Sequence, residues 1–158
     1  MLQAKNLQKK FKEKEVVKKI NLELGTGESI GLLGPNGAGK STTISMLSSL
    51  MKPTSGTVLW NGTSIEGNPQ MLRKNLGVVP QEIALYPELT AQENLEFFGR
   101  IYGLKGKNLE TRVEDVLEKI GLSDRRKDRV KTFSGGMKRR LNIGAALLHK
   151  PSFLIMDE

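Results

Sequence analysis

The spacing of apolar and polar residues divides this chain into a strand-rich first half and a helix-rich second half. Short runs that alternate or are apolar throughout predict strands at 1–7, 16–24, 57–60 and 76–79. Ile30–Leu33 is a compact apolar run, which predicts a further strand buried on both faces. Lys40–Leu50 predicts a helix, and Asn61-Gly62 predicts a tight hairpin turn.

From about Tyr86 onward, apolar residues recur every three or four positions, as in amphipathic helices. A capping box, Thr90-x-x-Glu93, precedes the first stripe, which consists of Ala91, Leu95, Phe98 and Tyr102. The second stripe consists of Leu109, Val113, Val116, Leu117 and Ile120. The third helix begins at Ser134, and its stripe consists of Met137, Leu141, Gly144, Ala145 and Leu148. Pro151 ends it, and 153–156 predicts a return to the sheet, so a helical segment interrupts a parallel α/β core.

The 158 residues fit a single domain, which we expect to consist of an α/β core at 1–85 and 150–158 and a helical subdomain at 86–149. An apolar content of 37% is typical of a globular protein. The absence of cysteine and the single histidine exclude disulfides, thiolate metal sites and histidine-cluster metal sites. No apolar run reaches the length of a signal peptide or a membrane span, so we expect a cytoplasmic protein.

The net charge is 25 − 17 = +8, and the basic residues gather at 5–19, 125–131 and 138–140. A basic surface can bind nucleic acid, acidic lipid or nucleotide. Glu13, Glu15 and Asp128 interrupt these runs, and no aromatic residues lie among them to stack on bases. The pattern therefore makes a nucleic-acid partner unlikely.

The run from Gly34 to Ser41 fits G-x-x-x-x-G-K-[ST], the phosphate-binding P-loop or Walker A motif. It follows a predicted strand and opens a predicted helix, so backbone N–H groups and the helix dipole can surround a phosphate. Lys40 supplies a positive charge for the β- and γ-phosphates, and Ser41 can bind Mg²⁺. The sequence therefore predicts a site for a nucleoside triphosphate.

Two carboxylates, Asp157 and Glu158, follow the apolar run at 153–156 in the manner of a Walker B strand. In a P-loop protein, we expect Asp157 to hold the magnesium ion, through water, and Glu158 to act on the hydrolytic water.

Ser134-Gly135-Gly136 begins the third helix, and taken alone it is an ordinary N-cap. It is also a second exposed helix N-terminus with a hydroxyl group, which is a second candidate phosphate site. One chain does not need two such sites for one triphosphate. Two chains do, if each P-loop faces the other chain's Ser134 across a two-fold axis.

These motifs together resemble the nucleotide-binding subunit of an ABC transporter, over the whole chain. Phe133–Met137 is similar to the signature of this family, usually Leu-Ser-Gly-Gly-Gln, and departs from it at the first and last positions. The resemblance implies a P-loop NTPase fold with a RecA-like, mostly parallel sheet, N-terminal antiparallel strands and an inserted helical subdomain. It also implies that Phe11 stacks on adenine and that Gln81 contacts the metal and links core to helices. Alternatively, Phe11 is an ordinary core or surface residue and Gln81 a polar residue after a strand.

The expected ligands are ATP and Mg²⁺, and the expected catalytic residues are Lys40 and Glu158. The predicted nucleotide-binding residues are Phe11, Gly34, Pro35, Asn36, Gly37, Ala38, Gly39, Lys40, Ser41, Thr42, Gln81, Ser134, Gly135 and Gly136. The predicted metal-binding residues are Ser41, Gln81 and Asp157.

Several phrases are similar to bacterial ABC-2-type exporters, and they lie at 31–43, 85–90, 97–102 and 136–141. The resemblance implies an ATPase that energises transport, forms a dimer with a second nucleotide-binding subunit and works with a separate transmembrane permease at the inner face of the cell membrane. We expect the permease to contact the region from Gln81 to about Leu95, where 83–87 is apolar and aromatic in a predicted loop. Alternatively, Leu85 and Tyr86 fill the junction between subdomains.

The family continues after the Walker B strand with a loop at the dimer interface and a strand whose histidine contacts the γ-phosphate, so we expect a chain truncated after Glu158, without the C-terminal part of the domain. His149 precedes the Walker B strand, and we interpret it as a residue at a helix C-terminus. Two alternatives remain at this point: a nucleic-acid- or ribosome-associated ABC protein, and an ATP-binding fragment deficient in hydrolysis.

Overall fold

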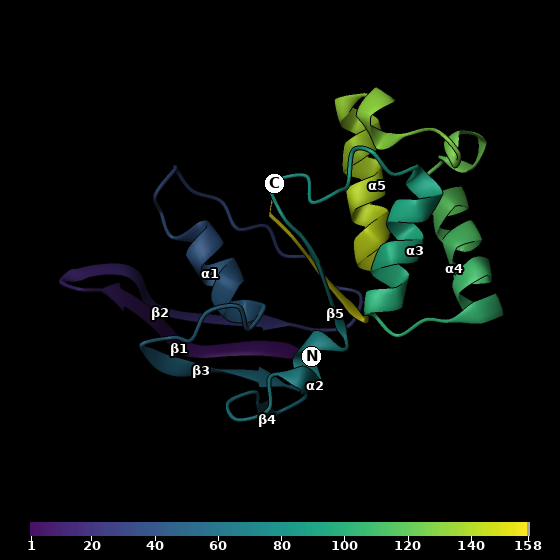
Figure 1. The fold of residues 1–158 in the computed structure, drawn as a ribbon. Coiled ribbons are helices and arrows are strands. Elements are labelled where there is room, and N and C mark those ends of the chain that lie inside the picture. Colours follow the sequence, from purple (N-terminus) through teal and green to yellow (C-terminus); the bar gives the residue numbers. More distant parts are fainter. Residues whose placement is uncertain (158) are drawn as a thin grey trace. The chain divides into compact units, whose positions relative to one another are not determined.

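The structure of the chain is a computed structural model that describes residues 1–157. Within it the chain forms two compact units, Met1–Lys74 and Asn75–Glu158 (Figure 1). Glu158, the predicted catalytic carboxylate, lies outside the described residues. The expected division into a core and a helical subdomain at residue 86 stays a prediction.

The first unit is built on an antiparallel sheet with the strand order β2-β1-β3-β4. Its strands are β1 (Leu2–Phe11), β2 (Lys14–Leu24), β3 (Ser55–Trp60) and β4 (Thr63–Ser64). Leu2, Leu7, Val17 and Val58, which lie on these strands, are buried almost completely. The predicted turn at Asn61-Gly62 is confirmed, because both residues have positive φ, 48° and 80°, as a tight turn between antiparallel strands requires.

Helix α1 (Lys40–Leu47) and the short helix α2 (Gln70–Arg73) complete the regular elements of this unit. Helix α1 is shorter than the predicted range of 40–50. The hydroxyl group of Ser48 donates to the Ile44 carbonyl at 2.8 Å, and Ser49 takes a positive φ of 59°, which ends the helix.

The predicted buried strand at Ile30–Leu33 is wrong for this structure. The segment carries no strand, and the side chain of Leu33 is 96% exposed. A strand needs a hydrogen-bonded neighbour, and the sheet of the first unit contains β1 to β4 only. Apolar composition predicted burial here, but it did not specify the neighbouring strand.

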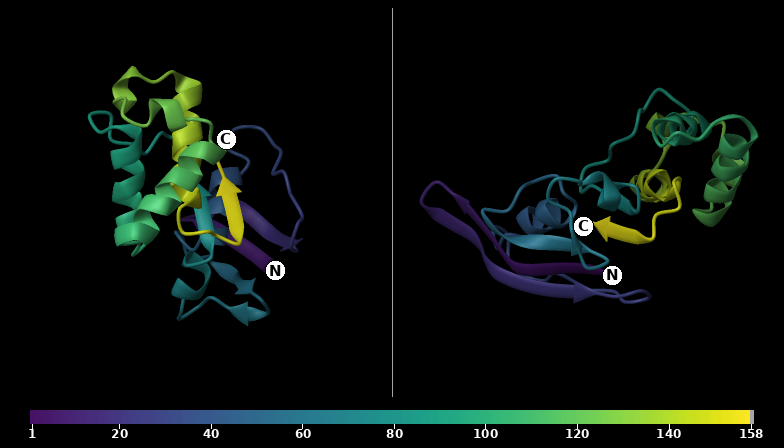
Figure 2. Two further views of the ribbon diagram at one scale, coloured as in Figure 1. Left: turned by 90° about the vertical axis from the view of Figure 1, so that its right-hand side faces the viewer. Right: turned by 90° about the horizontal axis from the view of Figure 1, so that it is seen from below.

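The second unit contains a parallel pair of strands and a bundle of helices. Strands β5 (Leu76–Val79) and β6 (Phe153–Met156) match the predicted ranges and lie side by side, with Val79 opposite Met156 (Figure 2). Helix α5 (Gly135–Leu147) packs tightly on β5, because a Cβ added at Gly77 would lie 2.6 Å from the carbonyl oxygen of Ala146. The expected fold class is confirmed: the chain has antiparallel N-terminal strands and a parallel core sheet, which within residues 1–157 consists of β5 and β6.

The bundle consists of α3 (Ala91–Ile101), α4 (Gly106–Lys119) and α5 (Gly135–Leu147), joined by short 3₁₀ helices η1 (Ser123–Arg125) and η2 (Val130–Thr132). Its core confirms most of the predicted stripes and includes Ala91, Leu95, Leu109, Val113, Val116, Leu117, Ile120, Leu141, Ala145 and Leu148. Tyr102 is the exception, since its side chain is half exposed at the end of α3.

The predicted capping box is confirmed at the start of α3. The hydroxyl of Thr90 accepts a bond from the N–H of Glu93 at 3.1 Å, and the Glu93 carboxylate accepts one from the N–H of Thr90 at 2.8 Å. The bond from the Thr90 N–H to the carboxylate is the main cause that holds the pKa of Glu93 below its ordinary value, and the Thr90 hydroxyl lowers it further. Among the helices of residues 1–157, none has the length and apolar content needed to cross a membrane.

Candidate functional site

The P-loop is the connection between the first sheet and helix α1. The N–H of Ala38 donates to the carbonyl of Pro35 at 3.2 Å, which makes a turn, and the helix then begins at Lys40. No acidic side chain lies in the first turn of α1, so the positive end of the helix dipole is not neutralised by the helix itself. The first amide groups of any helix have no acceptor within that helix, which makes this end suitable for an anion.

Gly39 is the N-cap of α1, and no other residue fits its position. Its φ is 88°, in the left-handed region that favours glycine. A Cβ at this position would lie 2.7 Å from the carbonyl oxygen of Val16 in strand β2. The second glycine of the motif is therefore fixed by the turn and by close packing against the sheet. Gly37 also has a positive φ, 82°, but a Cβ there would meet no atom within 4 Å.

The side chain of Lys40 bends back over the loop. Its Nζ atom donates to the carbonyl oxygens of Gly34 at 2.7 Å and Pro35 at 3.1 Å. The ammonium group is thus held at the loop by neutral acceptors, which an anionic phosphate oxygen can replace with a stronger, charge-assisted bond. Ser41 and Thr42 follow in the first turn of α1.

Ser134 is the N-cap of α5, as the sequence predicts, and its Oγ accepts a bond from the N–H of Met137 at 3.3 Å. The next two residues, Gly135 and Gly136, are exposed, and a Cβ added at either would meet no atom within 4 Å. Packing inside this chain therefore does not explain why both residues are glycine. Glycines with open space around them suit a surface that a ligand or another backbone approaches closely.

Gln81 and Asp157 lie at the same edge of the parallel sheet, because they follow the carboxyl ends of its paired strands. The N–H of Asp157 donates to the carbonyl of Val79 at 3.0 Å, which extends the pairing of β6 by one residue. Gln81 is exposed, directly after Pro80. Within residues 1–157, no group of three or more His, Asp or Glu side chains is arranged to hold a metal ion.

Phe11 ends strand β1 with its ring 45% exposed, and the Nζ atom of Lys9 lies 5.3 Å from the ring centroid. The P-loop and Phe11 belong to the first unit, whereas Gln81, Ser134 to Gly136 and Asp157 belong to the second. Stacking of Phe11 on adenine stays a prediction.

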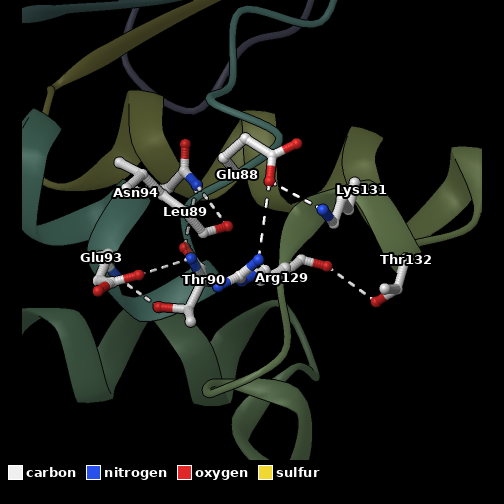
Figure 3. Close-up of polar contacts among 8 residues, drawn as sticks. All are labelled: Glu88, Leu89, Thr90, Glu93, Asn94, Arg129, Lys131 and Thr132. Atoms are coloured by element: carbon white, nitrogen blue, oxygen red, sulfur yellow. Dashed lines mark hydrogen bonds and ion pairs between the residues drawn. The ribbon is translucent and has the colours of Figure 1, made fainter.

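Sequence analysis missed three polar residues that hold the segment between β5 and α3. Asn94 on α3 is fully buried, and its side-chain amide accepts a bond from the N–H of Tyr86 and donates one to the Tyr86 carbonyl. Figure 3 shows Asn94 beside Leu89 and Thr90. On α5, Asn142 donates to Pro80 and accepts from the N–H of Ala84, and Arg139 donates to the same Pro80 carbonyl at 3.0 Å. A polar residue among the apolar positions of an amphipathic helix was the available signal, and Asn94 lies next to Leu95.

Charged residues cover the outside of this segment. Glu88 lies 2.8 Å from the Nζ atom of Lys131 and 3.8 Å from Arg129, and its bond with Lys131 is the main cause that lowers its pKa (Figure 3). Arg125 pairs with Asp128. The basic run at 125–131 is therefore partly neutralised by acidic neighbours.

Comparison with known proteins gives a family match over most of the chain. The family described as ABC transporter matches residues 17–158. Two curated relatives are similar over all 158 residues. The linearmycin resistance ATP-binding protein LnrL of Bacillus subtilis (strain 168) is 56% identical, and the match covers 100% of this chain and 51% of that protein. A Nod factor export ATP-binding protein I, from Cupriavidus metallidurans, is 43% identical, and the match covers 100% of this chain and 52% of that protein.

Solved structures agree with this match. A dimeric ATP-binding cassette in a post-hydrolysis state, bound to ADP and Pi, superposes with a TM-score of 0.85 at 29% identity, over 100% of this chain and 74% of that chain. The present chain spans about half the length of the two curated relatives.

Proposed function

This chain belongs to the ABC transporter family, and we propose that it provides ATP binding and hydrolysis in the ATP-binding subunit of an ABC transporter, which energises the movement of a substrate across a membrane. The observation that carries the proposal is the P-loop, where Gly39 packs against β2 and the Lys40 ammonium lies 2.7 Å from the Gly34 carbonyl. A loop at the positive end of a helix, with a lysine held over it, is suited to a triphosphate.

In this proposal, Lys40 and the amide groups of the loop bind the β- and γ-phosphates. Ser41, Gln81 and Asp157 provide hydroxyl, amide and carboxylate oxygens, the donor types that Mg²⁺ prefers. A magnesium ion in such a site neutralises charge that develops on the phosphates. Glu158 is proposed to orient and activate the attacking water, and Phe11 to stack on the adenine base.

We further propose that two chains act together, each presenting Ser134, Gly135 and Gly136 to the nucleotide held by the other. The open space around the two glycines supports this arrangement, because nothing within the chain occupies it. The similar ATP-binding cassette in its ADP- and Pi-bound state is also dimeric.

The proposed membrane partner is a separate permease that contacts the region from Gln81 to Leu95. Exposed aromatic side chains support this region as an interface, since Tyr86 is 47% exposed and packs edge-on against Phe97, with ring centroids 4.8 Å apart. We propose that the chain lies at the inner face of the cell membrane, held there by this transmembrane permease. The name of the Nod factor export relative supports an exporter, as do the phrases shared with ABC-2-type proteins.

No observation favours a nucleic-acid-associated function over this one. The basic run at 125–131 carries its own acidic partners, Asp128 and Glu88. Sequence-independent binding of nucleic acid depends on lysine and arginine side chains that can replace counterions on phosphates.

Nucleotide binding is the first test, because it depends on the P-loop. We expect Lys40→Ala to weaken the binding of Mg-ATP by roughly ten- to a hundredfold, since a charge-assisted bond to phosphate contributes about 1.5–3 kcal/mol. Isothermal titration calorimetry measures this change. Lys18→Ala, which removes an exposed lysine of β2, is the matched control and should bind like the wild type. Equal affinity in the Lys40→Ala variant would contradict the proposal.

A further inference from the structure

The segment from Pro80 to Thr90, which we call the connecting segment, has no helix or strand, yet its backbone is held at several points. Irregular backbone that is withdrawn from water needs hydrogen-bond partners, and here many of them come from elsewhere in the second unit. Asn94 and Asn142, two buried side chains on α3 and α5, supply part of them. The connecting segment is therefore fixed to the helices by side-chain amides.

Asn94 makes the larger contribution. Its Oδ1 accepts a bond from the N–H of Tyr86 at 2.8 Å, and its Nδ2 donates to the Tyr86 carbonyl at 3.0 Å. The same Nδ2 lies 2.9 Å from the carbonyl oxygen of Thr90 and 3.4 Å from that of Leu89. The side chain is 0% exposed, so water cannot replace these bonds if they are lost.

The far end of the connecting segment pairs with the segment that precedes Ser134. Residues 87–92 run antiparallel to 126–131, with a bridge between Thr90 and Arg129. The N–H of Val130 donates to the Leu89 carbonyl at 3.0 Å, and the N–H of Lys131 donates to the Pro87 carbonyl at 2.9 Å. The Leu89 carbonyl accepts a bond from Asn94 (Figure 3) and another from the N–H of Val130, which joins the two networks.

Only a short stretch separates this pairing from the N-cap of α5. Val130 and Phe133 are buried, and η2 (Val130–Thr132) leads directly to Phe133 and Ser134. Residues 128–131 and Ser134 are thus joined by two residues, and Val130 and Phe133 belong to the same helical core, so a displacement of the pairing is passed on to Ser134 over a short distance.

We propose that Asn94 is a positioning residue whose bonds to Tyr86, Leu89 and Thr90 tie the connecting segment to α3 in the position where its backbone pairs with the segment before Ser134, so that the two segments move and open as one unit. The consequence rests on the proposed function: a partner that holds Tyr86 then affects the orientation of Ser134 toward the nucleotide of the opposite chain. The capping box of α3 and the ion pairs of Glu88 surround this tie but do not replace it, because neither bonds Tyr86.

Amide hydrogen exchange of the whole chain, measured by NMR, tests the tie. We expect Asn94→Ala to speed exchange about tenfold or more at Tyr86, and equally at Val130 and Lys131, whose own acceptors are not on Asn94. The interior amides of α4 and α5 should exchange as in the wild type. Faster exchange at Tyr86 alone, or the same increase throughout the bundle, would overturn the proposal.

Asn94→Asp provides a conservative variant with a pH signature, which also serves if Asn94→Ala does not fold. A neutral carboxylic acid can accept from Tyr86 and donate to one carbonyl, whereas a carboxylate cannot donate and repels the oxygens of Leu89 and Thr90. Burial at this position raises the pKa of the new carboxyl group above its ordinary value of about 3.9, so the neutral form persists to a higher pH. After correction for intrinsic exchange, protection at Tyr86, Val130 and Lys131 should fall together as the pH rises through the pKa of this group, which the pH dependence of its carbon chemical shift measures. Protection that falls at Tyr86 but not at Val130 and Lys131 would overturn the proposal.

Glu88→Gln is the matched control, because it weakens the ion pairs with Arg129 and Lys131 and leaves the backbone pairing and Asn94 intact. Its exchange at Tyr86 and Val130 should be unchanged, and loss of protection there would assign the tie to the ion pairs instead. None of these measurements needs nucleotide. A failure of the tie is therefore distinguishable from a failure of the proposed function, which the Lys40→Ala titration tests.

Discussion

At the scale of single residues, His149 shows how its surroundings set the charge of a side chain. Its ring stacks on that of Tyr102 with centroids 3.9 Å apart, and its Nε2 lies 3.1 Å from the carbonyl oxygen of Leu76. Burial is the main cause that lowers the pKa of His149 from its ordinary value of 6.5, and the charge of Arg112 lowers it further. The folded chain therefore favours the neutral imidazole.

We expect the stability of the wild-type chain to fall as the pH is lowered below about 6.5, since the unfolded state then binds a proton that the folded state resists. The contribution is fully present above the unfolded pKa and is lost as the pH falls toward the lowered folded pKa. Thermal unfolding followed by circular dichroism between about pH 5.5 and pH 7.5 measures it. His149→Gln should flatten this part of the curve. A wild-type melting temperature that does not change over this range would contradict the expectation.

At the scale of elements, the junction of β2, the P-loop and α1 depends on one backbone position. Gly39 combines a left-handed φ of 88° with the approach of Val16 to 2.7 Å from where a Cβ would lie. Gly37 has nearly the same φ, 82°, with no neighbour within 4 Å. A comparison of substitutions at these two glycines therefore separates two contributions to the free energy of unfolding: that of the left-handed backbone conformation and that of the contact with Val16.

We expect Gly39→Ala to destabilise the chain more than Gly37→Ala. Both variants lose roughly 1–2 kcal/mol from the left-handed conformation, and only Gly39→Ala must also move the backbone of β2. Urea unfolding without nucleotide compares the free energies of unfolding. Equal losses in the two variants would show that the contact with Val16 does not matter.

At the scale of the whole molecule, the proposed dimer makes the Ser134 end of α5 part of a site shared by two chains. Gly135 and Gly136 are exposed and surrounded by open space, so a larger residue there does not disturb the chain's own packing. An acidic residue near a helix N-terminus is also compatible with the helix dipole. A substitution at Gly136 therefore tests assembly without testing the fold.

We expect Gly136→Asp to leave the melting temperature and the binding of Mg-ATP unchanged and to abolish a dimer formed with a non-hydrolysable ATP analogue, because its carboxylate repels the phosphates of the opposite nucleotide. Analytical ultracentrifugation with and without the analogue measures the assembly. Wild-type chains that stay monomeric with the analogue, or a variant that dimerises equally well, would count against the shared site.

Local sequence signals predicted the elements that depend on neighbouring residues. The ranges of β5 and β6, the capping box at Thr90 and Glu93, and the turn at Asn61-Gly62 are confirmed because each is specified by apolar periodicity or by side chains within a few residues. The P-loop, the Ser134-Gly135-Gly136 signature and the Walker B run together likewise led to the correct family, since each motif consists of a few consecutive residues. The roles of the predicted site residues themselves stay predictions.

Tertiary structure decided the features that depend on a distant partner. Ile30–Leu33 has the composition of a buried strand, but composition does not provide the neighbour that a strand requires, and the segment forms none. Asparagine in a helix is usually exposed to water. Asn94 is nevertheless fully buried, and its amide bonds the irregular backbone of Tyr86, Leu89 and Thr90. By itself the sequence determined which local conformations are favourable. The fold decided which backbone polar groups are buried away from water, and hence which side chains provide the hydrogen bonds that water would otherwise make.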